Sequence, residues 1–151
     1  MATSGLSIVE VLVALALLGL LLALVLPRIN PRPLDLLADA RELAANAKAA
    51  RARAISRTTR YRIVVSAPTT YQVARADGAS WTTERTVELR PQVQFDGVGP
   101  TCAEFDSRGR LVSTPACPAG GVQLTFTLRD VGRNLTRRVI IHGAGLVEDT
   151  P

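Results

Sequence analysis

Near the N-terminus lies a run of 21 residues, Leu6 to Leu26, that contains a single charged side chain, Glu10. Ser7 and Gly19 are its only other interruptions. At 1.5 Å per residue, a helix of this length extends roughly 31 Å, which is enough to cross the hydrocarbon core of a bilayer. The run therefore argues against a plain soluble cytosolic enzyme.

Three kinds of segment place an apolar run near an N-terminus. A secretory signal peptide has a basic start and a small-residue cleavage site. Here residues 1–5 contain no Lys or Arg, and the run ends in Leu26-Pro27-Arg28. An ordinary membrane anchor fits the length but leaves Glu10 unexplained, because an acid at the centre of a membrane helix costs about 2.5–3.5 kcal/mol and usually has a partner.

The third kind fits best, because the segment from Gly5 to Leu15, GLSIVEVLVAL, resembles the cleavage signal of type IV prepilins and pseudopilins. The resemblance implies a leader of residues 1–5, a cut by prepilin peptidase after Gly5, and N-methylation of Leu6. It also implies that Glu10 pairs with the terminal amine of a neighbouring subunit during assembly. A charge in an apolar environment is relieved in this way by an opposite charge. The alternative is that Glu10 reaches the interface of a simple anchor.

The remaining 125 residues, from Pro27 to Pro151, suffice for one modest core. They carry 18 basic against 12 acidic side chains, which permits but does not require an anionic partner. Pro27 predicts either a helix kink or simply the end of the anchor. A second helix is predicted at about residues 34–57. Its apolar stripe recurs at spacings of 4, 3, 4, 3 and 4, at Leu36, Ala40, Leu43, Ala47, Ala50 and Ala54.

After this helix the apolar period changes to two, and β-branched residues become frequent. Turn-forming residues separate the predicted strands, and Asp77 to Thr83 is predicted to be a loop that contains Trp81. A long helix followed by antiparallel strands is typical of an α+β domain. The predicted strands are Arg60–Ser66, Thr70–Ala74, Glu84–Leu89, Val93–Asp96, Ala103–Asp106, Val122–Leu128 and Arg137–His142.

The domain also resembles the GspH/FimT group of minor pseudopilins and minor pilins. The resemblance is carried by the Ala-rich helix ending AARARAI (49–55), by YRIVV (61–65), VQF (93–95) and FDSRGR (105–110), and by a late strand with a Gly-containing tail. It implies a type IV pilin-like fold, in which a long N-terminal helix, half membrane-embedded and half amphipathic, packs on an antiparallel β-sheet head.

This resemblance also sets the expected organisation and location. Residues 6–26 would form the transmembrane and filament-core helix, and 27–151 a periplasmic head that is β-rich from 60 to 147. The chain would be a single-pass protein of the cytoplasmic (inner) membrane that assembles with other pilins or pseudopilins at or near a filament tip. It would support type II secretion or pilus assembly; the alternative is a FimT-like role in binding DNA for natural transformation.

Cys102 and Cys117 form the chain's only cysteine pair. The resemblance places this domain outside the cytoplasmic membrane, where a disulfide persists. We therefore expect a bond between them, worth about 3 kcal/mol for a loop of this size. The alternative is two unpaired thiols in a loop.

Arginines fall into two groups along the chain. One lies in the late helix and first strand, beside Tyr61, and comprises Arg51, Arg53, Arg57, Arg60 and Arg62, with Lys48. The other is Arg133, Arg137 and Arg138, which loosely match a Gly-Arg-rich element implicated in DNA uptake by some FimT-like proteins. Such groups could hold a phosphate backbone. The favoured interpretation is a solvated basic surface.

No residue pattern in the chain predicts catalysis, a metal site or a cofactor. His142 is the only histidine and has no nucleophile or metal-ligand spacing beside it. Glu148 and Asp149 are adjacent acids, which fall short of the oxygen cage that calcium needs. The expected role is structural, with no cofactor, no metal and no enzyme activity.

Overall fold

A computed structural model describes residues 8–25, 32–97, 101–118 and 123–151. The chain divides into two compact units, residues 1–33 and residues 34–151. We call the second unit the head. The predicted cleavage and methylation positions Gly5 and Leu6, and the predicted kink at Pro27, lie outside the described residues.

The first unit contains helix α1, Ile8–Val25. Glu10 is its only charged residue, and the rest of its sequence is apolar on every side. Ten of its large apolar side chains are exposed: Ile8, Val9, Val11, Leu12, Val13, Leu15, Leu17, Leu18, Leu20 and Leu21. Among the described residues, no helix is both long and apolar enough to span a membrane. The predicted span of residues 6–26 extends beyond them at both ends and stays a prediction.

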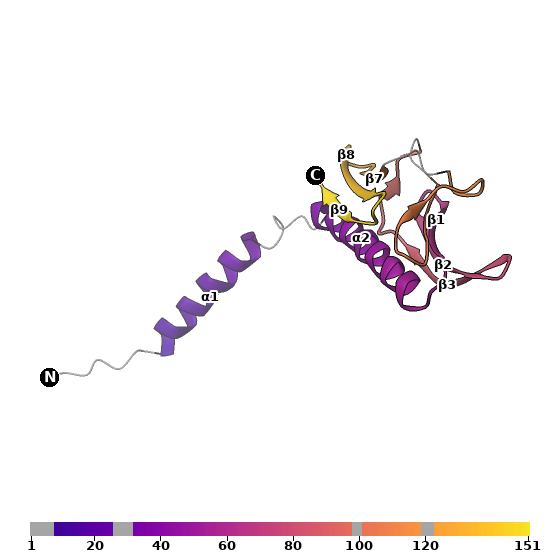
Figure 1. Cartoon of the computed structure of the whole chain (residues 1–151). Coiled ribbons are helices and arrows are strands. Elements are labelled where there is room, and N and C mark those ends of the chain that lie inside the picture. Colours follow the sequence, from indigo (N-terminus) through magenta and orange to yellow (C-terminus); the bar gives the residue numbers. More distant parts are fainter. Residues whose placement is uncertain (1–7, 26–31, 98–100, 119–122) are drawn as a thin grey trace. The chain divides into compact units, whose positions relative to one another are not determined.

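Helix α2, Arg32–Ser56, agrees closely with the predicted helix at about residues 34–57. Asp35 lies in its first turn and Arg53 in its last, which complements the helix dipole. All six residues of the predicted stripe are at most 3% exposed, and five of them are completely buried. Four of the six are alanine, so the buried face of α2, which lies beside the strands of the head in Figure 1, carries mainly small side chains.

Two antiparallel sheets make up the rest of the head. Sheet A has the strand order β3-β2-β1-β5-β6, and sheet B has the order β4-β7-β8-β9. The strands of sheet A are β1 (Tyr61–Ala67), β2 (Thr70–Asp77), β3 (Ser80–Glu88), β5 (Cys102–Phe105) and β6 (Leu111–Val112). Those of sheet B are β4 (Val93–Phe95), β7 (Gln123–Asp130), β8 (Leu135–His142) and β9 (Val147–Thr150).

One hydrophobic core joins α2 to both sheets. Its aromatic centre is a series of edge contacts in which Phe95 lies between Tyr71 and Phe126, with ring centroids 6.1 Å and 6.2 Å apart. Edge-to-face contacts of this kind add about 0.5–1.5 kcal/mol per pair to the burial of the rings. The core thus fixes sheet A to sheet B through β4, the short strand that carries Phe95.

The predicted strands are all present, but some boundaries were wrong and two strands were missed. Strand β3 begins at Ser80, so Trp81 lies in a hairpin strand and not in a loop. Most of β3 is exposed, and its sequence therefore lacks the alternation that a half-buried strand shows. Strands β6 and β9 have only two and four residues, too few for a clear period. Strand β8 begins at Leu135, two residues before the predicted start.

Candidate functional site

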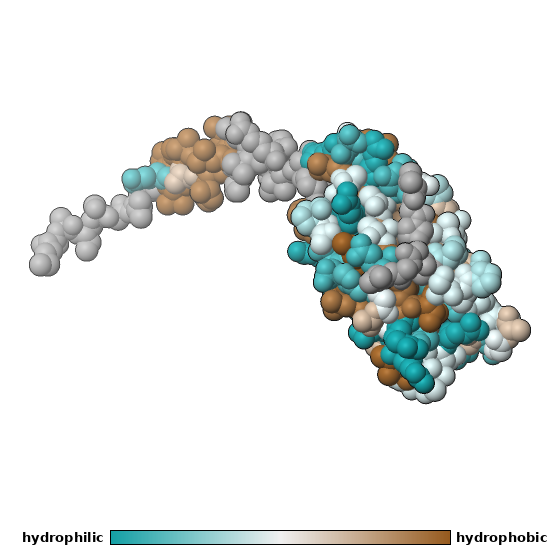
Figure 2. Space-filling view, turned by 45° about the horizontal axis from the view of Figure 1, so that its top comes forward, coloured by the Kyte–Doolittle hydropathy of each residue, from teal (hydrophilic) through white to brown (hydrophobic). Residues whose placement is uncertain are grey.

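Glu10 lies in the first turn of α1, where the partial positive charge of the helix N-terminus favours a carboxylate. Its side chain is exposed, as are the apolar side chains around it. In Figure 2 the described part of α1 is mostly brown, whereas the head mixes brown and teal. Exposed apolar side chains on every face of a helix are typical of a surface that other molecules cover, and a carboxylate in such a surface is stabilised by an opposite charge.

The cysteine prediction is confirmed, because Cys102 and Cys117 form a disulfide with Cα atoms 5.4 Å apart. Both residues are buried. The bond holds the segment after β6 against the first residue of β5. Thr114 and Cys117 exchange two backbone hydrogen bonds of 3.0 Å, which close this segment into a tight turn.

Arg133, Arg137 and Arg138 do not form one surface. Arg133 is exposed in the turn between β7 and β8, and the other two are consecutive residues of β8. Consecutive strand residues point to opposite faces of a sheet. Arg137 pairs with Asp149 at 3.6 Å, whereas Arg138 is exposed on the other face. The DNA-binding role of these three residues stays a prediction that their arrangement does not favour.

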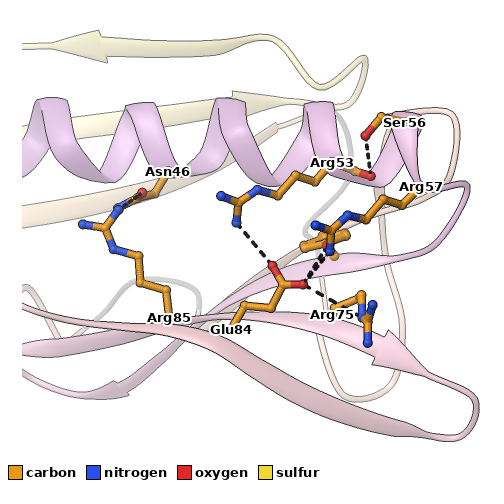
Figure 3. A network of polar contacts seen from close by, with 8 residues as sticks. Asn46, Arg53, Ser56, Arg57, Arg75, Glu84 and Arg85 are labelled. Atoms are coloured by element: carbon orange, nitrogen blue, oxygen red, sulfur yellow. Dashed lines mark hydrogen bonds and ion pairs between the residues drawn. The ribbon is translucent and has the colours of Figure 1, made fainter.

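Three arginines converge on Glu84 of β3, a residue that sequence reasoning missed. Strands β2 and β3 pair Val73 with Arg85 and Ala74 with Thr83, which leaves Glu84 as the extra residue of a β-bulge. A bulge re-aims side chains. Both Glu84 and its neighbour Arg85 therefore reach toward α2 (Figure 3).

Three guanidinium groups surround the Glu84 carboxylate. The N–O distances are 3.3 Å to Arg53, 2.9 Å to Arg57 and 3.9 Å to Arg75. The hydroxyl of Tyr61 donates a hydrogen bond of 2.9 Å to the same carboxylate and accepts one of 2.8 Å from Arg57. We call Arg53, Arg57 and Arg75 with Glu84 the arginine cluster. The cluster links α2 to β2 and β3, and its hydrogen bonds with Tyr61 add a link to β1.

A second missed carboxylate, Glu104, lies on the opposite face of sheet A. It is 2% exposed and accepts hydrogen bonds of 3.0 Å from Arg60 and 3.1 Å from Thr114. Arg62 lies over the ring of Trp81, with 4.2 Å from its guanidinium carbon to the ring centroid. Burial lowers the pKa of Arg62, and the nearby charge of Glu104 opposes that shift. Most of the basic group predicted along the late helix and β1 is therefore engaged within the head.

Buried polar groups join the first half and the middle of α2 to β2 and to the segment after β3. Asp39 accepts hydrogen bonds from the backbone and the guanidinium group of Arg90. Burial raises the pKa of Asp39, although the bonds from Arg90 counteract it. Asn46 donates a 2.6 Å bond to the Tyr71 hydroxyl, and burial raises the pKa of Tyr71 to about 12.

Arg51 connects α2 to loops of both sheets. Its side chain donates to the carbonyl of Gly109 at 2.9 Å and to that of Ala144 at 3.2 Å. Gly145 has a φ of 82°, and a Cβ there would overlap the Gly109 carbonyl oxygen and crowd Arg51. Gly109 itself has a φ of 75°, and a Cβ there would lie 2.6 Å from the Ile55 side chain. Glycine is therefore needed in both the β5–β6 and the β8–β9 turn.

The ion pairs and hydrogen bonds between α2 and the strands suit the packing of the head and the binding of a partner at its surface. In the ranges described, no three His, Cys, Asp or Glu side chains are placed to hold a metal ion. His142 lies 3.4 Å from Glu148, an ion pair when the imidazole is protonated. The polar groups described above hold the helix and the strands of the head together, and some of them remain partly exposed at its surface.

Comparison with known proteins agrees with this geometry. Residues 39–145 match the family model described as type II transport protein GspH. The type IV minor pilin FimU of Pseudomonas aeruginosa PAO1 has a similar fold, with a TM-score of 0.63 and 18% identity over 80% of this chain and 92% of that one. The minor pseudopilin EpsH from the type 2 secretion system of Vibrio cholerae has a TM-score of 0.60 and 12% identity, over 76% and 95% of the two chains. No curated protein sequence matches the chain.

Proposed function

This chain belongs to the GspH family of type II transport proteins, and from that premise we propose that it is a filament subunit whose α1 packs among the helices of its neighbours. Proteins of this family are structural, and the chain is not an enzyme. The fold is that of minor pilins and pseudopilins. Its role is therefore that of a minor pseudopilin of a type II secretion system or a type IV pilus.

One observation carries the proposal in its finer form: an all-apolar helix with a single acid in its first turn accompanies a GspH-type head. The exposed apolar side chains of α1 are stabilised when neighbouring helices cover them. Glu10 then sets the register, because its carboxylate pairs with the terminal amine of the next subunit. The head is displayed at or near the filament tip, where it supports protein secretion or pilus assembly.

Before assembly, the chain would sit in the inner membrane with its head in the periplasm. Prepilin peptidase would cut after Gly5, and the new N-terminal Leu6 would be methylated. The Cys102–Cys117 disulfide supports a head in an oxidising compartment, because such bonds are rare in the reducing cytosol. The apolar run of residues 6–26 supports insertion of the N-terminal segment.

N-terminal processing tests this proposal. The full chain is co-expressed with a prepilin peptidase, and its intact mass and N-terminal sequence are determined. We expect a mature chain that begins with methylated Leu6. We expect Gly5→Val to block cleavage and Gly19→Val to leave it unchanged, because Gly19 lies in α1, away from the predicted cut, with open space around it. An uncleaved chain, in cells that cleave a control prepilin, would contradict the proposal.

A further inference from the structure

The arginine cluster carries more positive charge than its own carboxylate balances. Three guanidinium groups lie within 4.0 Å of the Glu84 carboxylate, which leaves a local surplus of two positive charges. The three guanidinium groups repel one another, and further negative charge nearby would offset that repulsion. A surface of this kind is complementary to an anionic partner.

The positions of the arginines follow from regular structure. Arg53 lies in the last turn of α2, and Arg57 follows just after the end of that helix. The backbone N–H of Arg57 donates a 2.9 Å hydrogen bond to the carbonyl of Arg53, so the two side chains, four residues apart, leave the chain on the same side. Arg75 approaches from β2, and the β-bulge of β3 brings Glu84 between them. Figure 3 shows the Glu84 carboxylate directed at guanidinium groups from both elements. The cluster is thus pre-organised by the fold, which lowers the entropic cost of binding.

Its solvent-facing part is cationic. The arginine side chains are 47%, 50% and 38% exposed in the order Arg53, Arg57 and Arg75, whereas Glu84 is 22% exposed. Each guanidinium has five N–H donors in a planar fork, and Glu84 engages only some of them. The remaining donors match the bidentate geometry of a carboxylate.

We propose that the arginine cluster is a docking site for a carboxylate-rich segment of another protein subunit. A protein partner is favoured over a nucleic acid because, in the part of the head that the structure describes, no aromatic face beside the cluster is available for base stacking. Tyr61 is fully buried, and the Trp81 ring is stacked by Arg62. The inference rests on the proposed function for the identity of the partner as a filament subunit; the carboxylate-binding chemistry does not depend on it.

The proposal is tested by measuring the affinity of the full chain, in detergent, for poly-L-glutamate. The measurement is made at two salt concentrations. We compare the wild type with the double variant Arg53→Gln/Arg57→Gln. The matched control is Arg108→Gln/Arg133→Gln, which removes equal charge from two exposed residues elsewhere on the head. We expect the cluster variant to lose about tenfold in affinity, the control to lose little, and the difference to shrink at high salt.

Two further variants keep the test decisive. Arg53→Gln alone removes a half-exposed side chain whose only ion pair in the described residues is with Glu84, so the fold is retained and a smaller loss is expected. Arg53→Lys/Arg57→Lys keeps both positive charges but removes the planar guanidinium groups and their paired N–H donors. We expect this variant to show part of the loss of poly-L-glutamate affinity that the Gln double variant shows. Equal losses in the cluster and control variants would overturn the proposal, as would cluster-dependent binding of duplex DNA that exceeds the binding of poly-L-glutamate.

The two proposals can fail separately. Poly-L-glutamate binding requires neither processing nor a filament, whereas cleavage after Gly5 does not require Arg53 or Arg57. A chain that is cleaved and methylated but binds poly-L-glutamate equally well with and without these arginines would refute the docking site alone. An uncleaved chain with cluster-dependent binding would refute the filament role and leave the carboxylate-binding surface standing.

Discussion

Tyr61 and Tyr71 are the only tyrosines of the chain, and both are fully buried. Burial raises the pKa of each phenol, in Tyr71 to about 12, because the ionised form is poorly solvated. In the unfolded chain both titrate near about 10. The free energy of unfolding is therefore undiminished by tyrosine ionisation below that pH. It falls as the pH rises from there toward the pKa values of the two tyrosines in the folded chain.

Phenolate absorbance against pH measures this effect. We expect neither tyrosine of the folded chain to ionise at the pH where the urea-unfolded chain does. Above pH 10, the free energy of unfolding should fall by about 1.4 kcal/mol per pH unit for each tyrosine still protonated in the folded state. Tyr71→Phe should remove one such contribution. A phenol that titrates normally in the folded chain would contradict the burial of these rings.

Gly145 is required because its position combines a φ of 82° with contact to another backbone. Gly145→Ala adds a Cβ against the Gly109 carbonyl and Arg51 and should destabilise the head by about 2–4 kcal/mol. Gly78→Ala is the matched control, because Gly78 has a φ of 61° but open space around it. It should cost only about 1 kcal/mol. Urea unfolding distinguishes them, and equal losses would contradict the close contact.

Among the elements, helix α2 was the most predictable and strand β3 the least. The stripe of α2 repeats at helical spacing because one face is buried along its whole length. Strand β3 is an exposed edge strand, and the role of Glu84 depends on a bulge that arises only when β3 pairs with β2. The contact between Arg53 and Glu84 joins residues 31 positions apart, which no local pattern reveals.

The alanines of α2 set the distance between the helix and the sheets. Ala47 is completely buried, whereas Ala45 is exposed on the same helix. Ala47→Leu should therefore cost about 1–3 kcal/mol through overpacking. Ala45→Leu should change stability by no more than about 0.5 kcal/mol. Thermal or urea unfolding of the two variants measures the difference, and similar stabilities would show that the helix does not pack closely.

At the scale of the whole molecule, sequence reasoning predicted the division into an apolar N-terminal helix and an α+β head. It also predicted the disulfide, from the even cysteine count and the expected compartment. It grouped Arg137 with Arg138, although both lie in the predicted strand Arg137–His142, where consecutive side chains point to opposite faces. It also did not predict that most of the basic group from Lys48 to Arg62 would have partners. Those partners depend on contacts between distant residues.

We propose that this chain is a filament subunit that assembles through α1 and Glu10. The most direct measurement is the amount of the chain in purified filaments, when it is co-expressed with the other pseudopilins of its own system. Glu10→Gln is compared with Val11→Ala, a conservative change in the same helical turn. Loss of the Glu10 ion pair should reduce incorporation at least about tenfold, which corresponds to about 1.4 kcal/mol. Val11→Ala should have little effect. Full incorporation of the Glu10→Gln chain would contradict the account.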